Sequence, residues 1–143
     1  MLNLTNTNLT QGAPMTYQIK APILGFEHIT SIDLIRLDEY FAKISSPDKS
    51  LEMMLVNPYM LREYSFTIPK YIELLLGLDK NAMVEVYCIV VLQRNLEDSM
   101  VNFLAPLVFN TKDKLAAQIA LSMMDYPDFG FKDTLKSFIL QGA

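Results

Sequence analysis

The chain has 143 residues, of which 51% are hydrophobic and 20% are charged, and its formal net charge at pH 7 is −4. This composition is too apolar for a disordered chain, and it contains no run of about 18 uncharged apolar residues that would span a membrane. The acidic balance argues against unaided binding to nucleic acid, because neutralising phosphates requires clustered lysine and arginine. The length fits one domain around one core.

The amino-terminal segment and the cysteine content bear on domain organisation and compartment. Residues 1–14 are rich in Asn and Thr and carry no charged side chain. We predict a flexible lead over 1–14 and a single folded domain over 15–143. The lead lacks the basic and apolar regions of a secretory signal. Cys88 is the single cysteine and cannot form an internal disulfide, so a reducing cytoplasm is the expected compartment.

Short strands separated by turn-forming residues fill the first half of the chain. Tyr17, Ile19 and Ala21 alternate with polar residues, which is the pattern of a half-buried strand. Pro22 ends this strand, and Gly25 permits a turn. Further apolar runs with turn signals between them predict a meander. The predicted strands span residues 17–21, 31–37, 40–44 and 51–56, with a brief extended piece over 64–68.

One internal helix is predicted over residues 69–76. Pro69 suits its first turn with Thr67 as a cap, and Gly77 suits its exit. Apolar residues recur along it at helical spacing, and we expect this stripe to pack against the sheet. The stripe consists of Tyr71, Leu74, Leu75 and Leu78.

Residues 83–93 form the clearest predicted strand. Alternate residues from Val84 to Leu92 form an unbroken apolar face, which we expect to point inward, and Glu85 and Gln93 lie on the opposite face. Cys88 belongs to the apolar face. It is therefore predicted to be a small core residue rather than a reactive thiol, because no electropositive neighbour in the sequence lowers its pKa.

The last third predicts a hairpin and a helix. Pro106 starts a strand over 107–110, which a charged turn at 112–114 joins to a strand over 116–122. A helical apolar stripe follows at Phe131, Leu135, Phe138 and Ile139. The predicted fold class is mainly β: an antiparallel β-barrel-like or two-layer sheet with one short internal helix and a C-terminal helix.

The sequence predicts no catalytic residue, no metal ligand and no cofactor. His28 is the single histidine and lies in a predicted turn, and the adjacent carboxylates of Glu97 and Asp98 lack a third ligand. The glycines are scattered and form no phosphate-binding loop. Two methionine pairs, 53–54 and 123–124, are expected to place one side chain each away from the core, because neighbouring strand residues face opposite ways.

Four short segments, taken in order, carry a resemblance to a known family. They are Pro22-Ile-Leu-Gly-Phe-Glu27, Leu55-Val-Asn-Pro-Tyr59, Val101-Asn-Phe-Leu-Ala-Pro106, and Val108-Phe-Asn110 with Gln118. Over residues 15–129 the chain resembles the family of the flagellar assembly factor FliW. The order of elements in that family is a corner, a strand ending in a proline element, a helix, a long strand, a signature segment and a hairpin, and the order here matches it.

The resemblance implies a cytoplasmic, non-enzymatic protein that binds flagellin and, in an alternative state, the RNA-binding regulator CsrA. It implies no cofactor, no membrane partner and no direct contact with nucleic acid. A protein of this kind inhibits CsrA when free of flagellin and so relieves repression of flagellin translation. When unsecreted flagellin accumulates it occupies the factor and CsrA is released. Flagellin synthesis is thereby coupled to export.

An apolar groove is the natural receptor for the amphipathic helices of flagellin. The residues expected to line it are Gly25, Phe26, Asn57, Pro58, Tyr59, Asn102, Leu104, Ala105 and Pro106. The alternative is structural, with Gly25, Pro58 and Pro106 setting barrel corners and Phe26, Tyr59 and Leu104 plugging the barrel ends.

Other functions compete with this one. A small-ligand-binding barrel would need a hollow interior, and the bulky apolar face of 84–92 favours a filled one. Another protein-interaction module is a further alternative. A hydrolase using Glu97, Asp98 and His28 is disfavoured because these residues lack the spacing of a nucleophile and its base.

Overall fold

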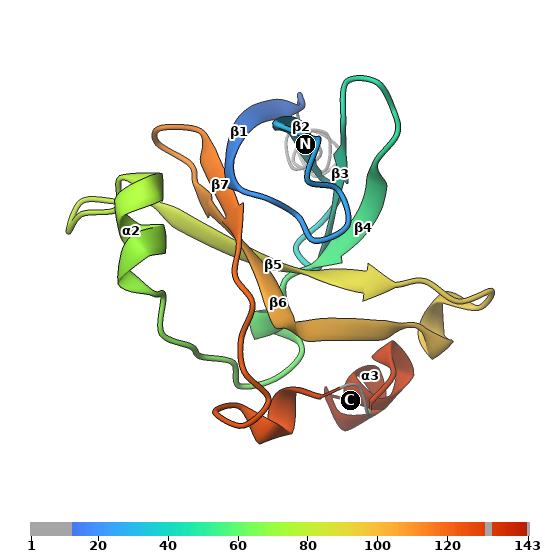
Figure 1. The fold of residues 1–143 in the computed structure, drawn as a ribbon. Helices are drawn as coiled ribbons and strands as arrows, with labels where there is room; N and C mark the ends of the chain where they lie inside the picture. Colours follow the sequence, from blue (N-terminus) through green and yellow to red (C-terminus); the bar gives the residue numbers. More distant parts are fainter. Residues whose placement is uncertain (1–12, 131–132, 143) are drawn as a thin grey trace, which may run out of the picture.

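The computed structural model describes residues 13–130 and 133–142. Within them, seven strands close into a barrel in chain order (Figure 1). The strands are β1 Met15–Ala21, β2 Ser31–Arg36, β3 Phe41–Ser45, β4 Glu52–Val56, β5 Val84–Val91, β6 Met100–Asn110 and β7 Leu115–Gln118. Successive strands pair antiparallel, and a parallel pairing of β1 with β7 closes the ring. The predicted fold class is confirmed, but no local sequence pattern indicated the parallel closure.

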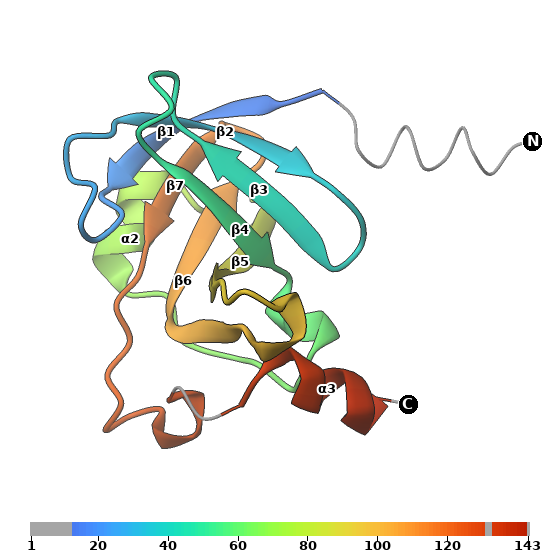
Figure 2. The same cartoon turned by 90° about the vertical axis from the view of Figure 1, so that its right-hand side faces the viewer.

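In the described part of the chain, two α-helices and three 3₁₀ turns flank the barrel. They are α2 Lys70–Leu76, α3 Leu135–Gly142, η1 Pro58–Met60, η2 Leu96–Asp98 and η3 Pro127–Phe129. Helix α2 packs against β1 and β7, and α3 lies beside η2 at the other side of the molecule (Figures 1 and 2). The short internal helix and the C-terminal helix are both confirmed. The proposed lead over 1–14 falls almost wholly outside the described residues, as does Phe131.

The barrel interior is filled by side chains from all seven strands. The rings of Tyr17 and Tyr87 meet Phe109 edge-on, with centroids 5.0 and 5.9 Å apart. Such pairs are the favoured arrangement of buried aromatic rings. The barrel core is completed mainly by Ile32, Leu34, Ala42, Ile44, Leu55, Leu107 and Ala116. This packing agrees with the expectation of a filled interior.

A second cluster, the outer core, lies on the outside of β5 and β6. Cys88 and Val90 point into it, together with Tyr64, Phe103, Phe129, Leu135 and Phe138. The predicted inward face of residues 84–92 is therefore wrong: its buried members face the outer core, and Tyr87 and Ile89 face the barrel interior. Both faces of β5 are covered, so apolar alternation alone could not tell inside from outside. Cys88 is nonetheless fully buried, as predicted, and burial raises the pKa of its thiol to about 12.

The same two-sided burial corrects the expectation for the first methionine pair. Met53 packs against the barrel core and Met54 against the outer core, so neither points away from packed surface. Met123 and Met124 are exposed, but they lie in a turn rather than a strand.

The position of α2 is confirmed, but the face that it buries is not. Ile72 and Leu76 are fully buried against Val108, Ala117 and Ile119. The exposed fractions of the predicted stripe are 60% for Tyr71, 71% for Leu74 and 39% for Leu75. Leu78, the fourth member, is partly buried beside the same cluster. The helix is apolar nearly all round, so periodicity did not define one face.

The ends of α2 are set by backbone geometry. Gly77 ends the helix in the left-handed region at φ 63°, where a side chain would be strained, as its predicted exit role requires. Thr67 is not the cap, because the N-cap position is Pro69 and no side-chain hydrogen bond is made there. The extended piece predicted at 64–68 pairs with no strand within the described residues.

Candidate partner-binding site

A large bulge in β6 lies at the centre of the predicted site. Tyr87 of β5 pairs with Leu107, whereas Ile89 pairs with Asn102, so Cys88 alone stands opposite residues 103–106 of β6. The strand bends sharply there (Figure 2). Proline, which lacks an N–H, is tolerated at a bulge. The predicted strand start at Pro106 is therefore wrong: the signature segment is a bend inside a longer strand that begins at Met100.

Each carbonyl oxygen of the bulge accepts a hydrogen bond. Tyr64 donates its hydroxyl to Phe103 O at 2.6 Å, and the Leu121 N–H donates to Leu104 O at 2.7 Å. The side-chain amide of Gln118 donates to Ala105 O at 3.2 Å. The Ile119 N–H donates to Pro106 O at 2.9 Å. Because buried backbone groups are costly to leave unpaired, these bonds fix the bulge in one conformation.

Gln118 also joins the bulge to the corner at residues 22–27. Its Oε1 accepts a hydrogen bond from the Leu24 N–H at 2.8 Å. The corner itself turns at Gly25, whose φ of 89° disfavours any side chain, and the Gly25 N–H donates to the Glu27 carboxylate at 2.8 Å. That bond lowers the pKa of Glu27. One side chain thus connects two of the predicted site segments.

Tyr64 makes the corresponding connection to η1. Its ring lies 5.8 Å from that of Tyr59 and 5.6 Å from that of Phe103, measured between centroids. Asn57 caps η1 by accepting a hydrogen bond from the Tyr59 N–H at 3.0 Å. Burial raises the pKa of Tyr64 well above its usual value, so its hydroxyl stays protonated and donating. All three predicted segments therefore converge on the bulge.

The nine predicted residues differ in exposure. Pro58 and Pro106 are buried, so their side chains are not exposed, and partner binding by the nine residues stays a prediction. Tyr59 is 52% exposed and does not plug the barrel. Gly25 is exposed, and the remaining residues are half-buried: Phe26, Asn57, Asn102, Leu104 and Ala105. We call the accessible group of Gly25, Phe26, Tyr59, Leu104 and Ala105 the bulge surface.

Two residues that organise this surface were not predicted as part of it. In the sequence, Gln118 is only a match within the resembling segments, and Tyr64 gives no sign of a role at this surface. Their roles arise from contacts with Leu24 and Phe103, which are 94 and 39 positions away along the chain. Amphipathic periodicity cannot reveal such contacts.

The groups considered for catalysis are dispersed. His28 is exposed in the turn that follows the corner, and Glu97 and Asp98 are exposed in η2. Across residues 13–130 and 133–142, no group of three or more His, Cys, Asp or Glu side chains is placed to hold a metal ion. No helix in this part of the chain has the length and apolar character needed to cross a membrane.

Comparison with known proteins identifies the family. A model of the FliW protein family matches residues 5–134. The chain is 67% identical over 130 residues to a flagellar assembly factor FliW of Helicobacter pylori strain G27, an alignment that covers 89% of this chain and 96% of that protein. It is 52% identical over 126 residues to flagellar assembly factor FliW 1 of Wolinella succinogenes, covering 87% and 98%.

A solved structure supports the fold. The crystal structure of a flagellar assembly factor FliW superposes with a TM-score of 0.71 at 21% identity, covering 83% of this chain and 82% of that one. The order of segments predicted from the sequence, the barrel fold and the matches along most of the chain agree. The chain belongs to the FliW family of flagellar assembly factors.

Proposed function

We propose that this chain is a non-enzymatic, cytoplasmic factor that binds flagellin and, when free of flagellin, holds the translational regulator CsrA. Flagellin that has not been exported would occupy the factor and release CsrA, so translation would follow export. The observation that carries this proposal is membership of the FliW family over nearly the whole chain. The proposed docking area is the bulge surface.

The bulge surface has the properties that a helical partner needs. It offers an exposed ring at Tyr59 and half-buried apolar groups at Leu104 and Phe26. Its backbone carbonyls are already hydrogen-bonded, so docking an apolar helix face leaves no bulge carbonyl without a partner. A surface fixed before binding also loses less entropy on association. These features favour recognition of an amphipathic helix such as those at the ends of flagellin.

The net charge of the chain supports binding of the second proposed partner, CsrA. The net charge of −4 suits a basic RNA-binding protein, whose phosphate-contacting face carries lysine and arginine. An acidic antagonist would accelerate encounter with such a face.

The experiment uses two substitutions that introduce a charge at the bulge surface. Tyr59→Glu and Leu104→Glu place a carboxylate where an apolar contact is proposed, and Tyr71→Glu on exposed α2 is the matched control. Affinities for purified flagellin and CsrA are measured by calorimetry, with circular dichroism to verify the fold. We expect a loss of about 30-fold or more for flagellin with the first two variants, the size of a hot-spot substitution, and no change with the third.

The outcomes distinguish a wrong location of the binding surface from a wrong function. If all three variants bind flagellin like the unaltered chain, the bulge surface is the wrong location. If the unaltered chain binds neither flagellin nor CsrA, the proposed function itself fails.

A further inference from the structure

Strand β4 ends opposite the middle of its antiparallel neighbour β5, so the first half of β5 extends beyond it. The two pair only through Leu55 with Ile89 and Val56 with Cys88. The Asn57 N–H still donates to Tyr40 O at 2.7 Å, and η1 then carries the chain away. The first half of β5, Val84 to Tyr87, continues to pair with β6 on its other side. Among residues 13–130 and 133–142, no strand therefore lies along the other edge of this half.

The backbone groups on that edge follow from the ladder. The Thr111 N–H donates to Met83 O at 2.8 Å across the β5–β6 side. Antiparallel hydrogen bonding alternates along a strand, so Glu85 and Tyr87 also direct their backbone groups toward β6. Val84 and Val86 direct theirs toward the missing continuation of β4. The open edge thus presents the N–H and C=O groups of two residues.

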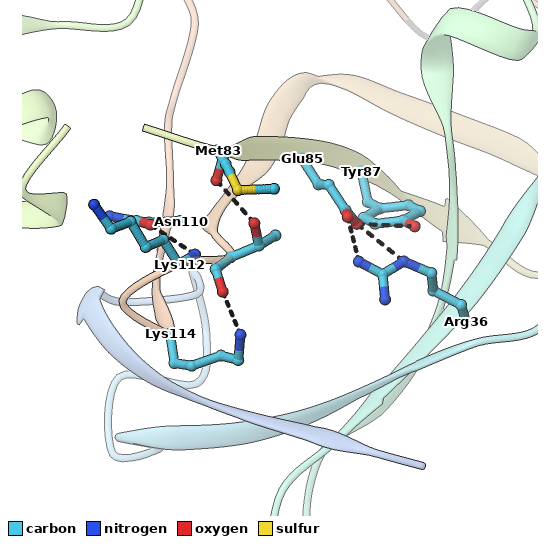
Figure 3. A network of polar contacts seen from close by, with 8 residues as sticks. Arg36, Met83, Glu85, Tyr87, Asn110, Lys112 and Lys114 are labelled. Carbon is cyan, nitrogen blue, oxygen red and sulfur yellow. Dashed lines mark hydrogen bonds and ion pairs between the residues drawn. The ribbon is translucent and has the colours of Figure 1, made fainter. Parts of the chain in front are cut away.

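A cavity of about 640 Å³ occupies this position. Its wall on one side is the open edge of β5, and on the other side it is the turn between β2 and β3, which contributes Asp38 and Glu39. At its base Arg36 of β2 reaches Glu85 of β5, with Arg36 Nε donating to Glu85 Oε1 at 3.1 Å (Figure 3). The hydroxyl of Tyr87 lies 3.5 Å from the same carboxylate oxygen. Because walls stand on both sides, the space suits a single added strand.

The rim of this cavity is acidic. Glu85 is paired with Arg36, which leaves Asp38 and Glu39 as exposed carboxylates on the turn. Asp38 also holds the turn, since its Oδ1 accepts hydrogen bonds from the N–H groups of Tyr40 and Phe41 at 2.8 and 2.7 Å. Its carboxylate is therefore fixed in place at the rim. A segment entering the cavity would meet two negative charges.

We propose that the open edge of β5 accepts an extended segment of a partner protein as an added strand, with a basic side chain of that segment facing Asp38 and Glu39. Main-chain hydrogen bonds to Val84 and Val86 would supply affinity, and the acidic turn would supply selectivity. This strand-addition site is separate from helix docking on the bulge surface, although Tyr59 borders both. The proposal of this site does not depend on which partner the bulge surface binds.

The first test uses amide hydrogen exchange followed by NMR. In the free chain the amides of Val84 and Val86 should exchange faster than those of Glu85 and Tyr87. The probe is a capped seven-residue peptide of alternating lysine and valine, and it should slow exchange at Val84 and Val86 at least tenfold. Two control peptides replace lysine with glutamate or N-methylate every amide, and neither should protect these residues.

Two substitutions separate the contributions of backbone and charge. Val84→Pro removes an N–H that faces the cavity and leaves the β6 ladder intact, so binding of the lysine peptide should weaken while the fold persists. Glu39→Lys should reverse the preference between the lysine and glutamate peptides, and Glu97→Lys in η2 is the matched control. Should Val84→Pro not fold, Glu39→Lys and the exchange rates still decide the matter.

Several results would overturn the proposal. One is slow exchange at Val84 and Val86 in the free chain, which would mean that the edge is not open. Others are equal binding of the N-methylated peptide, a preference for the glutamate peptide, protection confined to other strands, or no binding of the lysine peptide at millimolar concentration.

Discussion

At the scale of single residues, Asp48 holds the turn between β3 and β4. Its Oδ1 accepts hydrogen bonds from the Ser50 N–H at 3.0 Å, the Ser46 hydroxyl at 2.7 Å and the Ser50 hydroxyl at 2.8 Å. These bonds favour the ionised form and lower the pKa of Asp48 to about 2. The turn also contains Lys49 with a φ of 66°, a conformation that the hydrogen bonds help to hold.

This lowered pKa predicts a pH dependence of stability. A carboxyl group whose pKa is lower in the folded than in the unfolded chain stabilises the fold fully above its unfolded pKa, near 3.8, and loses that contribution as the pH falls toward about 2. We expect Asp48→Asn to lower the midpoint of thermal unfolding at pH 7. The difference from the unaltered chain should shrink between pH 4 and pH 2. Circular dichroism melts across this range measure it, and a constant difference would contradict the assignment.

At the scale of elements, the two faces of α2 predict opposite costs of substitution. Ile72 is fully buried, and Ile72→Ala should reduce the free energy of unfolding by about 2–5 kcal/mol through lost burial and a cavity. Leu74 is mostly exposed, and Leu74→Ala should change it by less than about 0.5 kcal/mol. Urea denaturation of both variants provides the measurement. A larger loss for Leu74→Ala than for Ile72→Ala would mean that the stripe predicted from periodicity is the buried face of α2.

The elements show which features local sequence encodes. Strand positions were predicted well because alternation and turn-forming residues act within a few residues of each other, as at β1 and the Gly25 corner. The inward face of β5 was not, because packing on both of its faces makes the pattern ambiguous. The bulge was mistaken for a strand start because Pro106 signals an interruption but not its kind.

At the candidate site, too, local sequence predicts some features and contacts between distant residues determine the others. The segments that form it were found from the sequence, and the structure brings all three to the bulge. Their connections through Tyr64 and Gln118 were not foreseeable, since each depends on a hydrogen bond between residues distant along the chain. The exposure of each residue likewise depends on the outer core, which only the folded chain defines.

At the scale of the whole molecule, a closed barrel carries its second core on the outside. The outer core is assembled from β4, β5 and β6, the segment around Tyr64, η3 and α3. Closure depends on the parallel pairing of β1 with β7, which joins residues nearly a hundred positions apart. Such a contact has a high loop-closure cost and leaves no local trace in the sequence. In the described part of the chain, β4 ends opposite Cys88 and leaves a short edge of β5 free at Val84 and Val86.

The net charge of the whole molecule predicts how salt affects the proposed binding of CsrA. With a charge of −4 the chain should attract a basic partner over distances comparable to the Debye length, which falls from about 10 Å at 0.1 M salt to about 3 Å at 1 M. Between 0.05 and 0.5 M salt the association rate should therefore drop about tenfold or more, while the dissociation rate, set by close contacts, changes less.

Stopped-flow association measures both rates, and flagellin provides the comparison. Its docking is proposed to rest on apolar contacts at Tyr59 and Leu104, which salt does not screen, so its association rate should depend less on ionic strength. A salt-independent association with CsrA would mean that charge does not guide the encounter. Equal salt dependence for both partners would instead mean that the two are recognised by the same kind of contact.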